Sequence, residues 1–312
     1  MKTDAVTAAD LGRSVIAVPP LARDRSGRVS PEENRKIVAW LASGGVSTVL
    51  YGGNANFYHL GVSEFGAVLD MLVAMAPEPA WIIPSVGPDY GKALDQIAIL
   101  KGHRFPTAMA LPMASPTRPA GVATGLRRLA DALGRPVVAY VRSENYLAPR
   151  DVAALIGDGA ICSLKYAVER KDPADDAYLA ALVEACGTER LVSGIGERPA
   201  IVHWTKFGLR AFTSGSVTVA PHLSSAIHAA LKSNDVANAE RLRTLFLPFE
   251  DQRDAHSPIV VLHDGVAFAG IADTGPIAPY LANLDAAAGA SAAPAAKALH
   301  EANDAFRRRK AA

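Results

Sequence analysis

The sequence has little of several features that mark particular classes of protein. Only two of its 312 residues are cysteines, Cys162 and Cys186, which are too few for a disulfide framework or a thiolate metal site. Both lie in apolar stretches, so we expect two buried thiols that pack as small hydrophobic side chains. No apolar run approaches the roughly 20 residues that span a membrane, and the N-terminus lacks the apolar core of a signal peptide. We therefore expect a cytoplasmic protein that does not bind membranes.

Strong charge of either sign is also missing. The formal net charge is +1, which gives no general electrostatic reason to expect a nucleic-acid partner. The eight histidines form no HxH or HExxH pattern, so we expect no metal site and disfavour a zinc-dependent mechanism. Of these histidines we place only His59 near an active site, and His203, His222 and His228 at the surface or at an interface.

Short β-branched or apolar runs alternate with longer segments of helical period. The expected strands are Ser14–Val18, Ser47–Tyr51, Trp81–Val86, Thr107–Leu111, Val137–Tyr140, Ala160–Lys165, Leu191–Gly194 and Leu209–Thr213. The expected helices between them are Pro31–Ser43, Ser63–Met75, Tyr90–Leu100, Ala120–Leu133, Arg150–Ile156, Ala174–Cys186 and Pro199–Phe207. Such alternation predicts a parallel sheet, and repeats of about 25 residues fit a closed (β/α)8 barrel of the α/β class. Neither a GxGxxG after the first strand nor a Walker loop occurs, which disfavours an open nucleotide-binding sheet.

Beyond about residue 222 the pattern becomes mainly helical. The expected helices there are Ser224–Ser233, Ala237–Phe246 and, after a loop rich in Pro and Gly, Ala287–Lys310. We expect a barrel domain over residues 1–222 and a helical region over residues 223–312 that packs on it. The Arg-Arg-Arg-Lys run near the end favours a solvated helix C-terminus, where cations interact well with the helix dipole, over a nucleic-acid tail.

The active site of a (β/α)8 barrel lies at the C-terminal ends of its strands. Lys165 ends the sixth expected strand after the apolar approach Ile161-Cys162-Ser163-Leu164. Inside the barrel mouth this lysine would be desolvated, which lowers its pKa and frees the amine to attack a carbonyl. The alternative is a lysine that extends to solvent or pairs with a carboxylate.

Other polar groups fall at the same end of the barrel. Tyr140 ends the neighbouring fifth strand, where its hydroxyl can carry a proton to and from a substrate or can serve packing alone. The turn Gly52-Gly53-Asn54 after the second strand can direct backbone N–H groups at a carboxylate, or it is simply a tight loop. Further candidates for substrate binding follow the fifth, seventh and eighth strands: Arg142, Ser193, Gly194 and Thr213.

With these residues in place, the chain resembles the dihydrodipicolinate synthase / N-acetylneuraminate lyase family of class I aldolases over roughly residues 12–250. The matching segments are Ala17-Val18-Pro19-Pro20-Leu21, the loop Tyr51–Leu60, Tyr140, Ser163-Leu164-Lys165-Tyr166-Ala167, Ser193-Gly194 and Val219-Ala220-Pro221. The resemblance implies a lyase that binds a pyruvate-type 2-keto acid as an imine on Lys165. It further implies a proton relay through Tyr140, no metal or organic cofactor, and a homo-oligomer, either a tetramer or its constituent dimer.

The chain also departs from this family, both in the loop that binds the keto-acid carboxylate and in the region that meets the second substrate. Gly53 and Asn54 stand where the family usually has two hydroxyl residues, and Leu111–Pro116 lacks a tyrosine that crosses to a neighbouring subunit. The family's arginine after the relay tyrosine is displaced, with Asn145 near its position and Arg142 three residues earlier. We therefore expect an aldolase or dehydratase for a 2-keto-3-deoxy acid. The alternatives are dihydrodipicolinate synthase itself and a regulatory member that binds a keto acid without turning it over.

Overall fold

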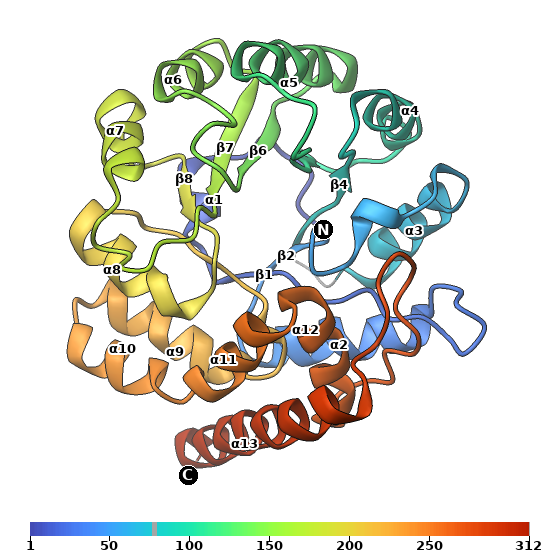
Figure 1. Cartoon of the computed structure of the whole chain (residues 1–312), viewed down its shortest axis with the longest axis vertical. Helices are drawn as coiled ribbons and strands as arrows, with labels where there is room; N and C mark the ends of the chain where they lie inside the picture. Colours follow the sequence, from blue (N-terminus) through green and yellow to red (C-terminus); the bar gives the residue numbers. More distant parts are fainter. Residues whose placement is uncertain (77–79, 312) are drawn as a thin grey trace.

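In the computed structural model, which describes residues 1–76 and 80–311, parallel strands close into a barrel inside a ring of helices (Figure 1). The strands are β1 (Ile16–Ala17), β2 (Thr48–Leu50), β3 (Trp81–Ile83), β4 (Ser85–Val86), β5 (Met109–Ala110), β6 (Val137–Val141), β7 (Ile161–Tyr166), β8 (Leu191–Ser193) and β9 (Thr213–Ser214). They pair in the orders β3-β2-β1-β9 and β4-β5-β6-β7-β8. A bridge between Ser193 and Phe212 joins β8 to the start of β9.

The expected third strand is interrupted at Pro84, which separates β3 from β4. Proline has no N–H to donate, but its carbonyl accepts the N–H of Met109 at 2.9 Å. The two pieces therefore act as one barrel strand, and each expected strand has a counterpart in the barrel.

The helices of the barrel follow the expected segments closely. They are α2 (Pro31–Ser43), α3 (Val62–Met75), α4 (Tyr90–Leu100), α5 (Pro119–Leu133), α6 (Pro149–Gly157), α7 (Ala177–Cys186) and α8 (Glu197–Phe207), preceded by the short unpredicted α1 (Ala8–Leu11). The bounds of α2 are those predicted, because Ser30 caps the helix by accepting the N–H of Glu33 at 3.3 Å and Pro31 occupies its first turn.

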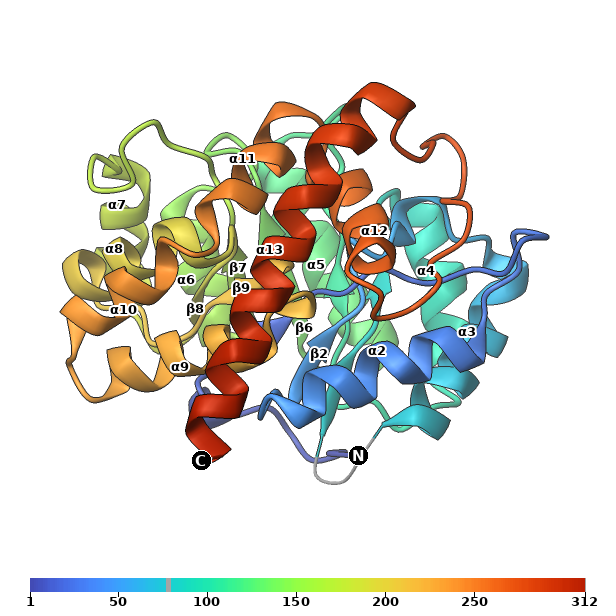
Figure 2. The ribbon, with the colours of Figure 1, turned by 90° about the horizontal axis from the view of Figure 1, so that it is seen from below.

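The C-terminal region forms α9 (Pro221–Lys232), α10 (Val236–Arg243), α11 (Leu247–Ala255), α12 (Pro258–Phe268) and α13 (Ala286–Ala311). The prediction of a loop from Phe246 to α13 is wrong over residues 247–268, where α11 and α12 form. The prolines responsible, Pro248 and Pro258, lie in the first turns of these helices, where proline begins a helix instead of breaking it. Figure 2 shows α13 lying along the outside of the barrel, with α11 and α12 beside it.

The orientation of α11 depends on its contact with α12. A Cβ atom on Gly265 of α12 would lie 2.7 Å from Cζ of Phe249, so the two helices approach too closely for a side chain there. Phe249 is fully buried in this contact. Glu250 and Arg253, three residues apart, share a face of α11, and the contact of Phe249 with α12 fixes the orientation of the helix.

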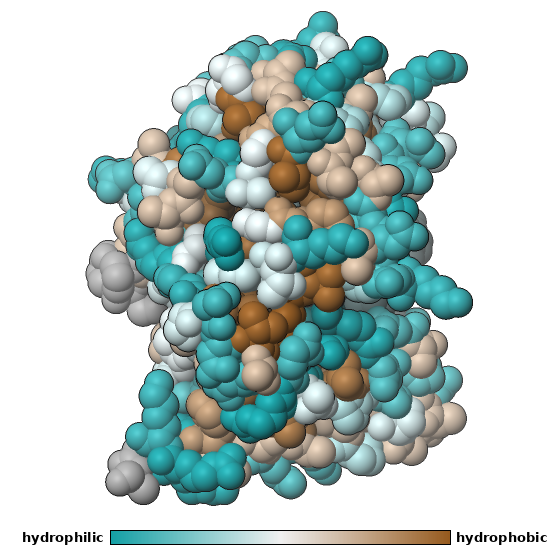
Figure 3. Space-filling view, turned by 90° about the vertical axis from the view of Figure 1, so that its left-hand side faces the viewer, coloured by the Kyte–Doolittle hydropathy of each residue, from teal (hydrophilic) through white to brown (hydrophobic). Residues whose placement is uncertain are grey.

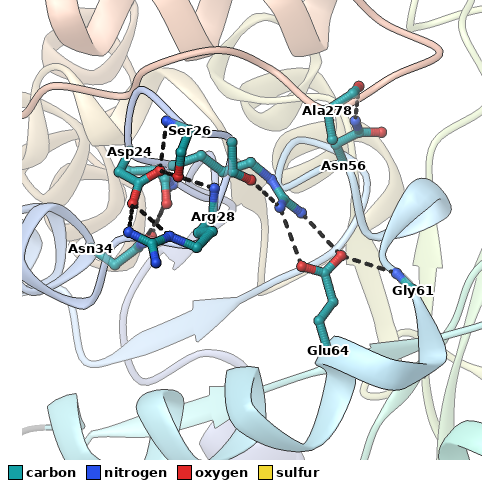
Figure 4. Close-up of polar contacts among 11 residues, drawn as sticks. Asp24, Ser26, Arg28, Asn34, Asn56, Gly61, Glu64 and Ala278 are labelled. Carbon is teal, nitrogen blue, oxygen red and sulfur yellow. Dashed lines mark hydrogen bonds and ion pairs between the residues drawn. The ribbon is translucent and has the colours of Figure 1, made fainter.

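Polar contacts hold the long loops at the barrel mouth (Figure 4). Asp24 accepts hydrogen bonds from Ser26 and Arg28 within the loop after β1. The amide nitrogen of Asn56 donates to the carbonyl of Ala278 at 2.9 Å, which ties the loop after β2 to the segment before α13. The C-terminal region is therefore connected to the same end of the barrel at which the strands finish.

Two predictions about individual side chains need correction. Cys162 is buried as expected, but Cys186 at the end of α7 is only half-buried. His203 and His228 were expected near the surface and are instead buried in the packing of α8 and α9. Burial lowers the pKa of each imidazole to about 4, so both are neutral at pH 7.

Within residues 1–76 and 80–311, no helix has both the length and the apolar character needed to cross a membrane. The same residues contain no group of three His, Cys, Asp or Glu side chains arranged to hold a metal ion.

Candidate active site

A cavity of about 660 Å³ opens at the C-terminal ends of the strands. Its size suits a small-molecule ligand, since such sites usually enclose about 300–1,000 Å³. Most of the predicted site residues line it: Gly53, Asn54, Tyr140, Arg142, Lys165, Gly194 and Thr213. Gly52 and Ser193 are absent from its lining.

Lys165 reaches the cavity from β7. It pairs in register with Tyr140 of β6, so both side chains point to the barrel interior. The lysine is 5% exposed, and its Nζ donates a hydrogen bond to the carbonyl oxygen of Gly194 at 2.9 Å. No carboxylate of the described part of the chain lies within ion-pair distance of it. Lys165 therefore neither extends to solvent nor neutralises an acid.

Burial lowers the pKa of Lys165 to about 7, and the charges of Arg142 and Arg253 act in the same direction. A substantial fraction of this side chain is then an uncharged amine near neutral pH. The uncharged amine is the form that attacks a carbonyl carbon. The cavity thus holds a lysine amine that is partly uncharged near neutral pH.

The ring of Tyr140 lies against this amine, with its centroid 3.9 Å from Nζ. Burial raises the pKa of the Tyr140 hydroxyl, so it keeps its proton and can donate it. The exposed Arg142 lies close enough to interact with the hydroxyls of Tyr140 and Tyr58. Tyr58, from the short helix η1 (Phe57–His59), also lines the cavity. It was not predicted as a site residue, although it lies in the loop that carries the family resemblance.

The three residues Gly52, Gly53 and Asn54 of the loop after β2 have different surroundings. Gly52 is buried beneath the site, and a Cβ atom there would lie 2.6 Å from Cε of Met109, so its absence of a side chain serves barrel packing. Gly53 has space above it, with only Cε2 of Tyr58 near its missing Cβ, at 3.5 Å. The Asn54 amide nitrogen donates to the carbonyl of Val18 at 3.0 Å, which occupies one of its two N–H groups.

Ser193 and Gly194, at the end of β8, point in different directions. Ser193 pairs in register with Tyr166, one residue beyond Lys165, so its side chain faces away from the barrel interior. Its hydroxyl lies 2.8 Å from Nδ1 of His203 in α8. A Cβ atom on Gly194 would lie 2.4 Å from the carbonyl oxygen of Tyr166, so only glycine fits there. Ser193 therefore fixes α8 against the barrel and does not reach the cavity.

Helix α11 contributes two charged residues that were not predicted. Arg253 and Glu250 both line the cavity, and both are at least nine-tenths buried. Arg253 donates from Nη1 to the hydroxyl of Ser216 at 3.2 Å and from Nε to the carbonyl of Pro258 at 3.3 Å. Their spacing of three residues was a usable signal, but the segment was assigned to a loop, where such spacing has no meaning.

A second buried acid supports this wall of the cavity. Glu197, at the start of α8, accepts hydrogen bonds from the hydroxyls of Ser214 at 2.7 Å and Ser224 at 2.5 Å. Glu250 accepts none, and its nearest cation is Arg198, with 3.7 Å between Oε2 and Nε. Burial raises the pKa of Glu250, and the charge of Glu197 raises it further.

His59, expected near the site, is exposed and does not line the cavity. Its ring meets that of Tyr280 at 5.4 Å, on the outer side of the loop.

The architecture is that of a closed barrel with a buried lysine at its mouth. The structure is similar to that of dihydrodipicolinate synthase from Bacillus clausii, with a TM-score of 0.82 and 20% sequence identity over 95% of this chain and 98% of that one. It is equally similar, at 14% identity over 95% and 98% of the chains, to a catalytic-lysine mutant of the sialic acid aldolase from Ruminococcus gnavus, with a TM-score of 0.82. A third similar structure is chloride-inhibited dihydrodipicolinate synthase from Acinetobacter baumannii complexed with pyruvate, with a TM-score of 0.82 and 19% identity over 92% and 98% of the chains.

The sequence matches no protein-family profile and none of the curated proteins compared with it. The structural similarity confirms the predicted fold, a (β/α)8 barrel with a C-terminal helical extension, and confirms at the level of fold the resemblance to the synthases and sialic acid aldolases.

Proposed function

We propose that this protein is a member of the dihydrodipicolinate synthase / N-acetylneuraminate lyase family that forms a Schiff base between Lys165 and pyruvate or a 2-keto-3-deoxy acid. The observation that carries the proposal is the state of Lys165. It is a buried amine with a pKa of about 7, unpaired with any described acid, at the wall of a ligand-sized cavity.

The residues around the amine suit imine formation. The nitrogen lone pair of Lys165 attacks the C2 carbonyl carbon, and the carbonyl oxygen becomes a hydroxyl. Loss of this hydroxyl as water needs a proton, which the protonated Tyr140 hydroxyl is placed to donate. The resulting iminium accepts the electron pair released when the bond from C3 to C4 breaks, or when a C3 proton leaves before elimination. No metal or organic cofactor takes part in these steps.

Two of the similar structures are consistent with this chemistry for those proteins. The sialic acid aldolase has a catalytic lysine, and one of the synthases is complexed with pyruvate. A binding protein that forms no product is the second candidate, because Gly53 and Asn54 supply no hydroxyl to the site.

Borohydride trapping with a panel of 2-keto acids, followed by intact mass measurement, tests the proposal. Wild type should gain a reduced adduct with its preferred acid, and Lys165→Ala should gain none. Lys165→Arg should be equally inactive, because a guanidinium stays protonated and does not attack. An adduct of equal yield in Lys165→Ala would overturn the assignment. Turnover of the trapped acid separates the enzyme from the binding protein.

We also propose that the protein is a homo-oligomer, a tetramer or a dimer. On the face that carries α7, α8 and α10, hydrophobic and neutral side chains gather near the middle, interspersed with hydrophilic ones (Figure 3). Light scattering at micromolar concentration should give the mass of an oligomer, and a monomer would contradict the proposal.

A further inference from the structure

We propose that Arg253 of α11 binds the C1 carboxylate of the 2-keto acid held on Lys165. This inference rests on the function proposed above. It assigns a substrate-binding role to a helix of the C-terminal region, in addition to the residues that the barrel strands contribute.

Arg253 is a buried cation without an acidic partner. It is 9% exposed, and no carboxylate oxygen of the described residues lies within 4.0 Å of its nitrogen atoms. Within the described residues it donates hydrogen bonds to two neutral oxygens, those of Ser216 and Pro258. Burying a charge without a partner is costly, and a bound anion would remove that cost. Glu250, three residues earlier, compensates poorly, because burial raises its pKa and favours its neutral form.

The other arginines of the cavity are engaged or hydrated. Arg198 pairs with Asp251 and, at 3.3 Å, with Asp254. Arg243 pairs with Glu240 at 2.8 Å.

Two further arginines line the cavity. Arg170 pairs with Glu144 at 2.9 Å and with Asp176 at 3.1 Å. Arg142 forms no ion pair with a described residue but is exposed at the rim, where water solvates its charge. Arg253 is therefore the one arginine of the described lining that is both buried and free of a carboxylate.

The position of Arg253 suits the carboxylate end of the substrate. A Cβ atom on Gly215 would lie 2.6 Å from Nδ2 of Asn54 and 3.0 Å from Nη2 of Arg253, so both nitrogens converge on the space above this glycine. The Nη2 atom of Arg253 donates no hydrogen bond to a described residue, and Asn54 retains one N–H after its bond to Val18. Two donors are thus available side by side, and a guanidinium suits the planar geometry of a carboxylate.

The same charge acts on the reacting groups. Arg253 contributes to the lowered pKa of Lys165 and interacts electrostatically with Tyr140. Because the carboxylate is bonded to the carbon that becomes the imine carbon, the group that binds it must lie close to both residues. Arg253 meets that condition from the C-terminal side of the barrel mouth.

The test compares pyruvate with pyruvamide, its neutral analogue, in cyanoborohydride trapping over a range of concentrations. The ratio of the two half-saturating concentrations measures how strongly the site prefers the charged acid. Arg253→Met should reduce this preference by about tenfold to a hundredfold, the range for losing hydrogen bonds to a charged group. Arg253→Lys, which keeps the charge, should retain part of it. The ratio does not depend on the fraction of folded protein, so lost stability does not imitate the result.

Two readouts separate this role from a structural one. Removing the neighbouring cation should raise the pH at which Lys165 is half-trapped in Arg253→Met, because the ammonium form becomes easier to keep. The matched control is Arg243→Met, which removes an arginine that already has a partner and should leave both the ratio and the pH midpoint unchanged. A wild-type ratio in Arg253→Met would overturn the inference.

Failure of the imine chemistry gives a different result. If wild type traps neither compound, the proposed imine on Lys165 is rejected. Calorimetric titration with pyruvate then tests the role of Arg253 separately. Weaker binding to Arg253→Met than to wild type and Arg243→Met would support the carboxylate site, and equal binding to all three would overturn it.

Discussion

The Nζ atom of Lys165 lies 3.9 Å from the centre of the Tyr140 ring, across the register pair that these residues form between β6 and β7. The contact has two opposing effects. A ring face attracts an ammonium, whereas burial favours the uncharged amine, and the net pKa of about 7 shows that burial prevails. The ring therefore orients the amine, and the hydroxyl at its far edge remains available for proton transfer.

Tyr140→Phe should separate these two functions. The variant keeps the ring against Lys165 and loses only the hydroxyl, so borohydride trapping should persist. Turnover of the preferred 2-keto acid should fall by roughly 10²–10⁴-fold, the usual contribution of a general acid or base. Steady-state kinetics on wild type and variant measure the change. A decrease of less than about threefold would reassign Tyr140 to packing.

Imine formation should depend on pH in the direction set by Lys165. Its pKa is lowered to about 7, so the protonated, unreactive ammonium dominates below pH 7 and the amine above it. The initial rate of cyanoborohydride trapping should therefore rise through pH 7 and level off above it, with Lys165→Ala as the blank at each pH. A midpoint near the ordinary lysine value, above pH 10, would show that the amine is not desolvated.

Side chains of increasing size at Gly53 test whether the loop after β2 borders the bound acid. A methyl group on Gly53 would meet only the Tyr58 ring, at 3.5 Å, so Gly53→Ala should retain trapping. Gly53→Val should abolish it, because the larger side chain fills the space above the loop while the fold persists. Circular dichroism of both variants controls for folding. If Gly53→Val traps pyruvate as wild type does, the loop does not border the bound acid.

Asn54→Ala should weaken keto-acid binding by roughly 1–2 kcal/mol, the range for losing a hydrogen bond to a charged group. The structure adds a second reason, because the amide also holds the loop to the carbonyl of Val18. Asn54→Asp is the informative companion: it keeps the size of the side chain but brings a negative charge toward the substrate carboxylate, and it should bind less tightly than Asn54→Ala. Titration with pyruvate measures both, and wild-type affinity in both variants would remove Asn54 from the site.

The barrel and the interior position of Lys165 could be predicted from the sequence because both depend on short-range patterns. Alternation along β7 separates Lys165, which faces the interior, from Tyr166, which faces the helices. The same period of two explains why Ser193, predicted to bind substrate, faces away from the cavity: it pairs with Tyr166 and not with Lys165. That register depends on how neighbouring strands align, which no single strand reveals.

The C-terminal half of the site was harder to predict. Pro248 and Pro258 resemble loop residues in a linear pattern, yet each stands in the first turn of a helix. Because α11 was not predicted, Glu250 and Arg253 were not among the predicted site residues, although both line the cavity from this helix. Tertiary contacts such as that of Phe249 with α12, and not local propensity alone, fix which face of α11 lies toward the cavity.

The buried carboxyl of Glu250 gives a prediction about stability. Its pKa is raised in the folded protein by burial and by Glu197, above the value of 4.5 that it has when exposed. In the pH range above 4.5, the folded state then holds a proton that the unfolded state has released. Folding stability therefore falls as the pH rises through this range toward the raised pKa.

Glu250→Gln should remove this dependence, because the amide is similar in size and does not ionise. Urea unfolding at pH 5 and pH 8 measures the difference: wild type should lose stability relative to the variant at the higher pH, by on the order of 1 kcal/mol. Asp251→Asn is the matched control, since this neighbouring acid is exposed on the same helix and should give no comparable change. A difference in free energy of unfolding between wild type and Glu250→Gln that is the same at pH 5 and pH 8 would show that the pKa of Glu250 is not raised in the folded protein. A variant that is less stable than wild type at pH 8 would show that the ionised carboxylate of Glu250 is stabilised by nearby cations.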